Sequence, residues 1–333
     1  MTDQGMVVTP QPEATEAGRD ILAAGGNAID AAIATALVQT VVDPLMCGIA
    51  GFGSLAVYLP SKGVHTYYDF HSPAPGAVRP NMWECLIEGE ARDGYGFILK
   101  GNVNDVGYQS ICVPASLKAY AEAHGDHGKL PWAELFGPAI AYAEGGWNVR
   151  PHVHTFWTEE GMMGRVGNAE RIAFTPAARE LYCRSDGSPK RVGDGVTNRD
   201  YGAVLRAISK AGAEVFYQGE IADAIDADMQ AHGGLLRRSD LETYRIVRNA
   251  PLASRPQFPR HEQSATWRRH HVARDARRTR KFRSAVIGSQ QHRVYSSCRR
   301  GHEGCDPRQG PLHWRSVLRG RPDRTSDFEG SLQ

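Results

Sequence analysis

The sequence predicts a domain that mixes α-helices with β-strands over residues 1–252, followed by a tail of a different kind over residues 253–333. Two observations support the domain: helices with clear start and stop signals, and a pair of alternating segments joined by a short turn. The third observation is an abrupt change of charge after residue 252. About 250 residues of ordinary apolar content can bury a core of their own, so we expect one domain or a large part of one.

The N-terminal part of the chain predicts two consecutive helices. Segment 12–24 begins with a proline, carries glutamates in its first turn and ends at a Gly-Gly pair. Segment 28–42 follows Asn27, which is a good helix cap, and stops before Pro44. Its apolar residues cover most of its faces, so we expect this second helix to lie buried between layers.

A β-hairpin is predicted next, from two alternating segments, 54–59 and 63–70, separated by Pro-Ser-Lys. The glycine cluster Cys-Gly-Ile-Ala-Gly-Phe-Gly at 47–53 precedes it. A phosphate-binding loop needs a strand, then glycines, then a helix N-terminus, whereas here the order is helix, glycines, strand. The cluster therefore favours close packing of a strand against a buried helix, with phosphate binding as the minor alternative.

The middle of the chain is predicted to be mostly helical. Ser239 and Glu242 have the spacing of a capping box and predict a further short helix that starts there. The other predicted helices carry start and stop signals of their own and cover residues 114–124, 131–144, 197–211 and 219–232.

The charge distribution divides the chain in two. Residues 1–252 hold 21 Lys+Arg against 30 Asp+Glu, and residues 253–333 hold 18 against 7, so net charges of −9 and +11 make up the total of +2. Of the 18 basic residues in the tail, 17 are Arg, and six His accompany them. A folded or nucleic-acid-binding tail normally mixes Lys with Arg and has a hydrophobic period. Specific nucleic-acid binding is therefore not predicted, and non-specific phosphate binding stays a rival hypothesis.

Several other classes of site and segment are not expected. The six cysteines form no CxxC pair, and His124/His127 and His152/His154 lack a third ligand at suitable spacing, so we predict no metal site and no disulfide framework. No GxSxG nucleophile motif occurs. The N-terminus lacks the regions of a signal peptide, and no stretch reaches the ~18 apolar residues of a membrane span. These features predict a cytoplasmic protein without membrane contact.

The block Ala-Gly-Gly-Asn-Ala-Ile-Asp-Ala-Ala at 24–32 resembles the "GGNAVDAA" signature of the γ-glutamyltransferase family. Further pieces follow in the family's order over nearly all of residues 6–252, at 48–58, 113–116, 128–132, 138–140, 216–219, 233–236, 240–241 and Tyr244. The resemblance implies an α+β fold: the large-subunit part of the αββα sandwich of N-terminal-nucleophile hydrolases.

What the family does follows from its processing. Its precursors cleave themselves into a large and a small subunit, and the new N-terminal Thr of the small subunit attacks the γ-glutamyl amide of glutathione or a similar small molecule. The α-amine of that Thr serves as the base. The resemblance therefore implies a small-molecule amide substrate, no cofactor and no metal, and a need for a small subunit as partner.

One departure from the family lies at residues 69–75. The family's typical "DFRETAP" is Asp-Phe-His-Ser-Pro-Ala-Pro here, which makes His71 and Ser72 the candidate substrate-binding residues by position. The family's Arg grips the substrate α-carboxylate, and a single imidazole cannot replace a bidentate guanidinium. A divergent branch that acts on other amides or acyl groups is thus an alternative, as is a His71 that merely packs at a strand end.

The other departure is the tail. Read one base later, Trp267 and Trp314 become Gly, and permitted codons rewrite residues 267–316 as a family-like segment with amphipathic helices and a terminal Gly-Asp-Pro. We therefore predict that the chain is frameshifted and truncated after about residue 252, that residues 253–333 are disordered, and that none of the fourteen threonines is the catalytic nucleophile. This chain alone is expected to be inactive. A non-catalytic interaction protein that keeps the scaffold is a further hypothesis.

Overall fold

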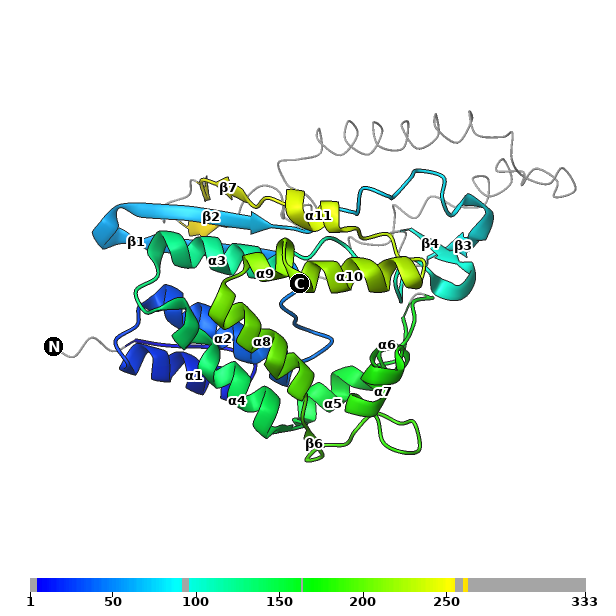
Figure 1. Ribbon diagram of the computed structural model, residues 1–333, viewed down its shortest axis with the longest axis horizontal. Helices are drawn as coiled ribbons and strands as arrows, with labels where there is room; N and C mark the ends of the chain where they lie inside the picture. Colours follow the sequence, from blue (N-terminus) through cyan, green and yellow to red (C-terminus); the bar gives the residue numbers. More distant parts are fainter. Residues whose placement is uncertain (1–4, 92–95, 163, 255–259, 263–333) are drawn as a thin grey trace, which may run out of the picture. The chain divides into compact units, whose positions relative to one another are not determined.

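The computed structural model describes residues 5–91, 96–162, 164–254 and 260–262, all of which belong to the first of two compact units, Met1–Arg280 (Figure 1). The described part mixes helices with small antiparallel sheets, as the sequence predicts. Leu252–Ser254 (β8) crosses the predicted boundary after residue 252 and pairs antiparallel with Arg260–Glu262 (β9), so the prediction of disorder from residue 253 onward does not hold for these paired residues. The rest of the predicted disordered tail lies outside the described residues.

The two N-terminal helices form as predicted. Helix α1 spans Pro12–Ala23 and α2 spans Ala28–Val42. They are joined through Gly25, whose φ of 93° falls in the left-handed region that glycine tolerates. Twelve of the fifteen residues of α2 are buried, because it packs against α1 and also against the helices that follow. Helix α2 is therefore the central helix of the core, as its apolar composition predicts.

The predicted hairpin is also present. Strand β1 (Gly53–Leu59) pairs antiparallel with β2 (Val64–Phe70), and a short 3₁₀ turn, Pro60–Lys62, joins them. Strand β7 (Val247–Asn249) adds to β2 from the far end of the domain and gives the sheet order β1-β2-β7. Figure 1 shows this sheet lying along one side of the helices, and side chains of β1 and β2 join their hydrophobic core.

The remaining helices largely match the predicted ones. The predicted helix 131–144 is divided, because Pro138 has no amide hydrogen to continue the first segment's ladder. In chain order the other elements are 3₁₀ Glu84–Leu86, β3 (Ile87–Glu90), β4 (Phe97–Leu99), 3₁₀ Lys100–Asn102, α3 (Ser116–His127), 3₁₀ Trp132–Phe136, α4 (Gly137–Gly145), β5 (Trp147–Asn148), α5 (Pro151–Trp157), α6 (Asn168–Ile172), α7 (Pro176–Tyr182), β6 (Gly195–Val196), α8 (Arg199–Ala211), α9 (Glu214–Tyr217), α10 (Glu220–Ala231) and α11 (Arg238–Thr243).

The predicted capping box at Ser239 is wrong. Helix α11 begins one residue earlier, so Ser239 lies inside it. The backbone N–H of Arg237 donates to Oδ2 of Asp240 over 2.9 Å, which makes Arg237 the N-cap and Asp240 the third helical residue. An acidic side chain at that position can bond the N-cap amide by itself, so the helix start does not need a serine hydroxyl.

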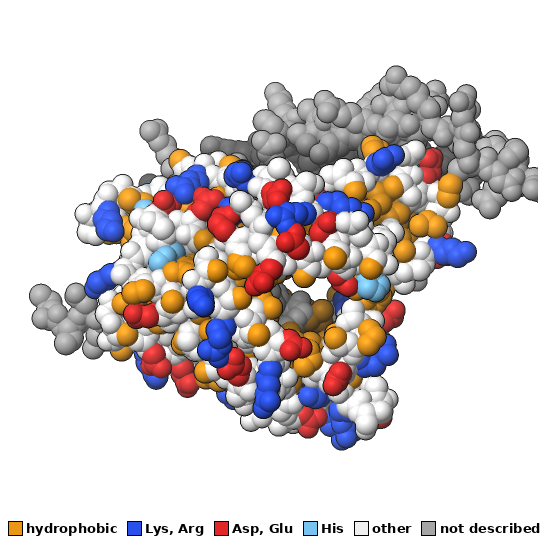
Figure 2. All heavy atoms as spheres, viewed as in Figure 1, with side chains coloured by type: hydrophobic (Ala, Val, Ile, Leu, Met, Phe, Trp, Pro, Cys, Tyr) orange, Lys and Arg blue, Asp and Glu red, His pale blue; other side chains and the backbone are white. Residues whose placement is uncertain are grey.

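The surface of the described region carries charges of both signs. On the face drawn in Figure 2, Lys and Arg side chains alternate with Asp and Glu, without a continuous basic area over the residues that are coloured. Within the described ranges, no helix is both long and apolar enough to cross a lipid bilayer.

Candidate functional site

His71, one of the two predicted substrate-binding residues, directly follows β2. Its ring Nδ1 lies 2.7 Å from Oδ1 of Asp69, and its backbone N–H donates to the same oxygen over 3.2 Å. An ionised carboxylate only accepts, so Nδ1 carries the proton and Nε2 is the ring nitrogen that Asp69 leaves unengaged. The Asp69 side chain is 6% exposed and that of His71 is 30% exposed. A buried carboxylate thus orients a partly exposed imidazole.

Phe52 lies beside this imidazole. The two ring centroids are 5.9 Å apart with the planes tilted by 41°, and Phe52 remains 64% exposed. Phe52 comes from the glycine cluster that precedes β1, and β1 begins where β2 ends, so this cluster and His71 meet at one end of the sheet. Sequence reasoning missed Phe52, because its proximity to His71 depends on the pairing of the two strands.

The glycine cluster is held by the start of α3. The carbonyl oxygen of Gly51 accepts hydrogen bonds from the backbone N–H groups of Ala115 and Ser116, both at 3.0 Å, and that of Ile49 accepts from Leu117 at 3.2 Å. A Cβ on Gly51 would lie only 3.0 Å from the carbonyl oxygen of Gly48. A phosphate bound at this helix N-terminus would need the same backbone N–H groups, which already donate to the carbonyls of the glycine cluster. The glycines therefore serve close packing, as predicted, with α3 as the helix they contact.

The segment after His71 is fixed at both ends. The backbone N–H of Val113 donates to the carbonyl of Pro73 over 3.0 Å, and that of Gly76 donates to Oδ1 of Asp240 over 2.9 Å. Ser72, the other predicted substrate-binding residue, lies half-buried in this segment. The structure thus places His71 and Ser72 next to each other at the end of the sheet.

Tyr244 adds to the electrostatics near Asp69. It is 6% exposed, and its hydroxyl has no hydrogen-bond partner among the described residues. Burial, reinforced by the negative charge of Asp69, raises the pKa of Tyr244 to about 12. The phenol therefore stays neutral at physiological pH and brings no negative charge to the site.

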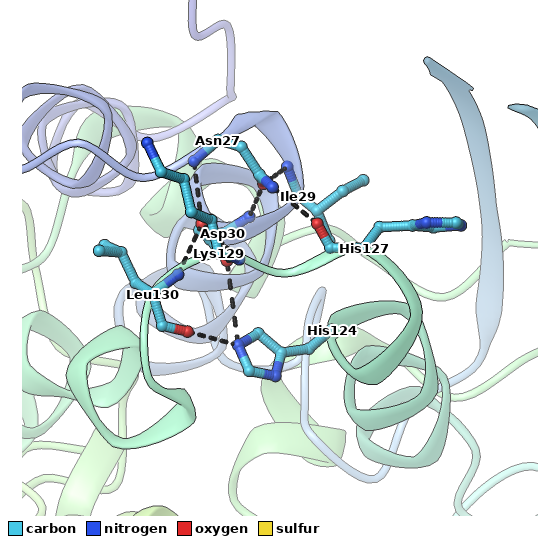
Figure 3. Close-up of polar contacts among 7 residues, drawn as sticks. All are labelled: Asn27, Ile29, Asp30, His124, His127, Lys129 and Leu130. Atoms are coloured by element: carbon cyan, nitrogen blue, oxygen red, sulfur yellow. Dashed lines mark hydrogen bonds and ion pairs between the residues drawn. The ribbon is translucent and has the colours of Figure 1, made fainter. Parts of the chain in front are cut away.

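The signature block at 24–32 has a structural role. Asp30 is fully buried at the start of α2, and its carboxylate accepts hydrogen bonds from the backbone N–H groups of Asn27 (2.9 Å), Lys129 (3.0 and 3.1 Å) and Leu130 (3.1 Å). Figure 3 shows these bonds converging on Asp30, with the Asn27 side chain donating to the carbonyl of His127 over 2.6 Å. The signature ties α2 to the turn after α3.

The four histidines considered for metal binding have other contacts. The ring of His127 meets that of Tyr68 edge-on, with the centroids 6.4 Å apart. His124 bonds the carbonyl of Leu130 through Nε2 at 2.8 Å, next to the Asp30 carboxylate. His152 contacts the side-chain amide of Gln11 at 2.6 Å, and His154 contacts the carbonyl of Lys190 at 3.0 Å. Among the residues that the structure describes, no group of three or more His, Cys, Asp or Glu could hold a metal ion.

Two other features are separate from His71. Cys47, at the start of the glycine cluster, is not activated: burial raises the pKa of its thiol to about 11, so it lacks the thiolate that a nucleophile needs. A cavity of about 430 Å³ is lined by residues that include Glu13, Tyr142 and Arg150. Neither His71 nor Ser72 is among its lining residues.

Known proteins similar to this chain place it in one family. The model of the family described as Gamma-glutamyltranspeptidase matches residues 14–258. The Acylase ACY 1 proenzyme of Pseudomonas sp. (strain V22) is 38% identical over 251 residues, which are 75% of this chain and 42% of the acylase. The Glutathione hydrolase proenzyme of Pseudomonas sp. (strain A14) is 32% identical over 251 residues, 75% of this chain and 40% of the hydrolase. The chain thus spans about two fifths of the length of these relatives.

Solved structures agree. The γ-glutamyltranspeptidase of Helicobacter pylori superposes with a TM-score of 0.69 at 25% identity, over 80% of this chain and 72% of that one. That of Pseudomonas nitroreducens gives 0.66 at 27% identity, with the same coverage. The α+β fold predicted from the sequence, part of an N-terminal-nucleophile hydrolase sandwich, is confirmed by these likenesses. Because the family match covers most of the chain, the chain belongs to the γ-glutamyltranspeptidase family.

Proposed function

We propose that residues 6–252 are the large-subunit part of a γ-glutamyltransferase-like enzyme, which hydrolyses or transfers the acyl group of small amides of the glutathione type. His71 and Ser72 bind the acyl group. The observation that carries the proposal is the imidazole of His71, oriented by Asp69 at 2.7 Å and still 30% exposed at the end of β2. It stands where the family's "DFRETAP" motif has its substrate-binding Arg.

A second candidate is favoured by His71 itself. With Nδ1 bonded to Asp69, His71 offers only Nε2 to a ligand, and Nε2 donates to a carboxylate only when both ring nitrogens carry a proton, whereas a guanidinium forms two parallel N–H bonds to a carboxylate. An acyl group that lacks the α-carboxylate of γ-glutamate loses less at such a site. The second candidate is therefore an acylase for other amides, and the 38% identity to a protein named as an acylase supports it.

The nucleophile is proposed to come from a small subunit. None of the fourteen threonines occurs in a nucleophile context in the sequence, and those with clear roles in the structure are structural. The hydroxyl of Thr175, for example, caps α7 by accepting from the N–H of Ala178 over 3.1 Å. The end of the family match at residue 258 also supports the proposed shift of reading frame after about residue 252. These 333 residues alone are therefore proposed to be inactive.

The test compares this chain with the product of a gene whose reading frame is restored after codon 252. The 333-residue chain should neither cleave itself nor release p-nitroaniline from γ-glutamyl-p-nitroanilide or glutaryl-p-nitroanilide. The restored precursor should cleave itself before a Thr into two subunits. The processed enzyme should then hydrolyse at least one of the two p-nitroanilide substrates. Turnover by the 333-residue chain would disprove the proposed origin of the nucleophile, and an inert, processed restored enzyme would disprove the proposed activity.

A further inference from the structure

The β1–β2 hairpin carries an aromatic ring against a histidine at each of its ends. Phe52 and His71 form one pair, with ring centroids 5.9 Å apart, and Tyr58 and His65 form the other, at 5.2 Å. Phe52 is 64% exposed and Tyr58 is 59% exposed. Tyr58 lies six positions after Phe52, so the two pairs are roughly 20 Å apart along the strand. The two pairs are alike in ring type and exposure, but they lie at opposite ends of the hairpin.

The backbone around Phe52 is fixed although its ring is exposed. Gly51, before it, is bonded through its carbonyl to two amides at the start of α3. Gly53, after it, begins β1, and a Cβ there would lie 3.1 Å from the ring of Phe70. Because the backbone is fixed on both sides of Phe52, its ring is held beside His71. The fold therefore leaves most of the apolar surface of this ring in contact with water.

We propose that Phe52 is a specificity-determining residue, whose ring contacts the hydrocarbon part of an acyl group held at its polar end by His71. The inference rests on the proposed role of His71 in binding that acyl group. It deepens the second candidate function, an acylase for other amides, and assigns to it acyl groups with an apolar aliphatic or aromatic body in preference to γ-glutamyl. A γ-glutamyl group would bring both an ammonium and a carboxylate to this ring, and the single Nε2 of His71 can pair with only one of them, so the other would lose hydration without a matching partner.

The experiment measures binding to the whole 333-residue chain by saturation-transfer NMR. The three probes are the p-nitroanilides of 4-phenylbutyrate, glutarate and γ-glutamate. They share one leaving group, so differences between them report on the acyl part. In Phe52→Ala the Kd for the 4-phenylbutyryl probe should rise about tenfold, the loss expected for a large share of one ring contact. The γ-glutamyl probe should change less than about twofold.

Matched variants separate this effect from a general loss of structure. Tyr58→Ala removes a similarly exposed aromatic residue from the other pair of the same hairpin, and it should leave all three Kd values unchanged. Phe52→Leu should recover most of the affinity for the 4-phenylbutyryl probe, because it restores an apolar side chain. Thermal unfolding of each variant by circular dichroism establishes that the compared chains are folded.

His71→Gln makes the possible failures distinguishable. If it weakens the glutaryl and γ-glutamyl probes while Phe52→Ala weakens none, the role of Phe52 is wrong and that of His71 stands. If neither variant affects binding, or the unmodified chain binds no probe, both are wrong. A larger loss for the γ-glutamyl probe than for the 4-phenylbutyryl probe in Phe52→Ala would mean that the ring attracts the ammonium by a cation–π contact, which overturns the inference.

Discussion

Asp69 and His71 project from the same side of the chain, so that one carboxylate oxygen, Oδ1, meets both the ring Nδ1 and the backbone N–H of the histidine. Residues two apart share a face in extended backbone, and the relationship follows from the continuation of β2 past Phe70. Because Asp69 is almost fully buried and His71 is not, the pair has a fixed inner member and an accessible outer one.

The first prediction concerns specificity at this pair. In the frame-restored enzyme, His71→Arg should lower KM for γ-glutamyl-p-nitroanilide relative to glutaryl-p-nitroanilide, because a guanidinium bonds the α-carboxylate through two N–H groups. A charge-assisted hydrogen bond is worth about 1.5–3 kcal/mol, so the ratio of the two KM values should move about tenfold. His71→Lys, which adds charge without the fork, should move it less. An unchanged ratio in His71→Arg removes position 71 from acyl recognition.

The second prediction concerns the signature residue Asp30. Asp30→Ala leaves the backbone N–H groups of Asn27, Lys129 and Leu130 without their acceptor, at roughly 1–3 kcal/mol for each donor that water does not reach. We expect it to be among the most destabilising single substitutions in this chain by urea unfolding. Thr175→Ala removes a helix cap that serves one amide and should cost about 1 kcal/mol. Equal losses would show that Asp30 does no more than cap its helix.

Local signals explain what could be predicted of the fold. Prolines, the Gly-Gly pair and the Asn27 cap set the bounds of α1 and α2, and strict alternation set the β1–β2 hairpin, because each signal acts within a few residues of the chain. The predicted start of α11 at Ser239 is wrong because two local capping signals overlap there. Asp240 caps the helix from inside, and Ser239 only has the right spacing.

The site was predictable only in part, because its contacts are long-range. Family resemblance pointed to His71 and Ser72, and alternation alone could have paired Asp69 with His71. Phe52 reaches His71 through the register that pairs Gly53 with Phe70, and no local pattern encodes that. The hydrogen bonds of Asp30 likewise join residues about a hundred positions apart in the sequence. The role of the signature therefore depends on how the helices pack, which no local pattern shows.

The third prediction concerns acid and the buried Asp43, which ends α2. It is 5% exposed, and its Oδ2 accepts from the side-chain amides of Gln11 (2.9 Å) and Gln39 (3.0 Å). Burial nevertheless raises its pKa above the ordinary 3.8. The folded state therefore holds a proton that the unfolded state releases, and the contribution of Asp43 to stability is largest below pH 3.8 and falls as pH rises through the raised pKa.

Asp43→Asn provides the measurement for that sign. Both amides donate to one oxygen, so an asparagine can keep both bonds with its carbonyl while losing the titration. The free energy of unfolding of Asp43→Asn relative to the unmodified chain should therefore rise from pH 4 to pH 7, as found by urea titration at each pH. His152, whose charge also acts on Asp43, should be tested alongside as His152→Gln. A difference that stays flat or falls across this range contradicts the raised pKa.

The last prediction concerns alkali. Burial raises the pKa values of Tyr120, to about 12, and of Tyr201 and Tyr217, both still higher, whereas an unfolded tyrosine titrates near 10. The unfolded state loses protons first, so stability should decline as pH rises above 10, and most of the phenolate absorbance of these residues should appear together with unfolding.

Tyr201→Phe should make that decline shallower. Thr40, which bonds the Tyr201 hydroxyl at 2.7 Å, also donates to the carbonyl of Leu37, so the variant leaves no orphaned hydroxyl there. Phenolate absorbance that appears fully before the circular dichroism changes would show that these tyrosines ionise within the fold.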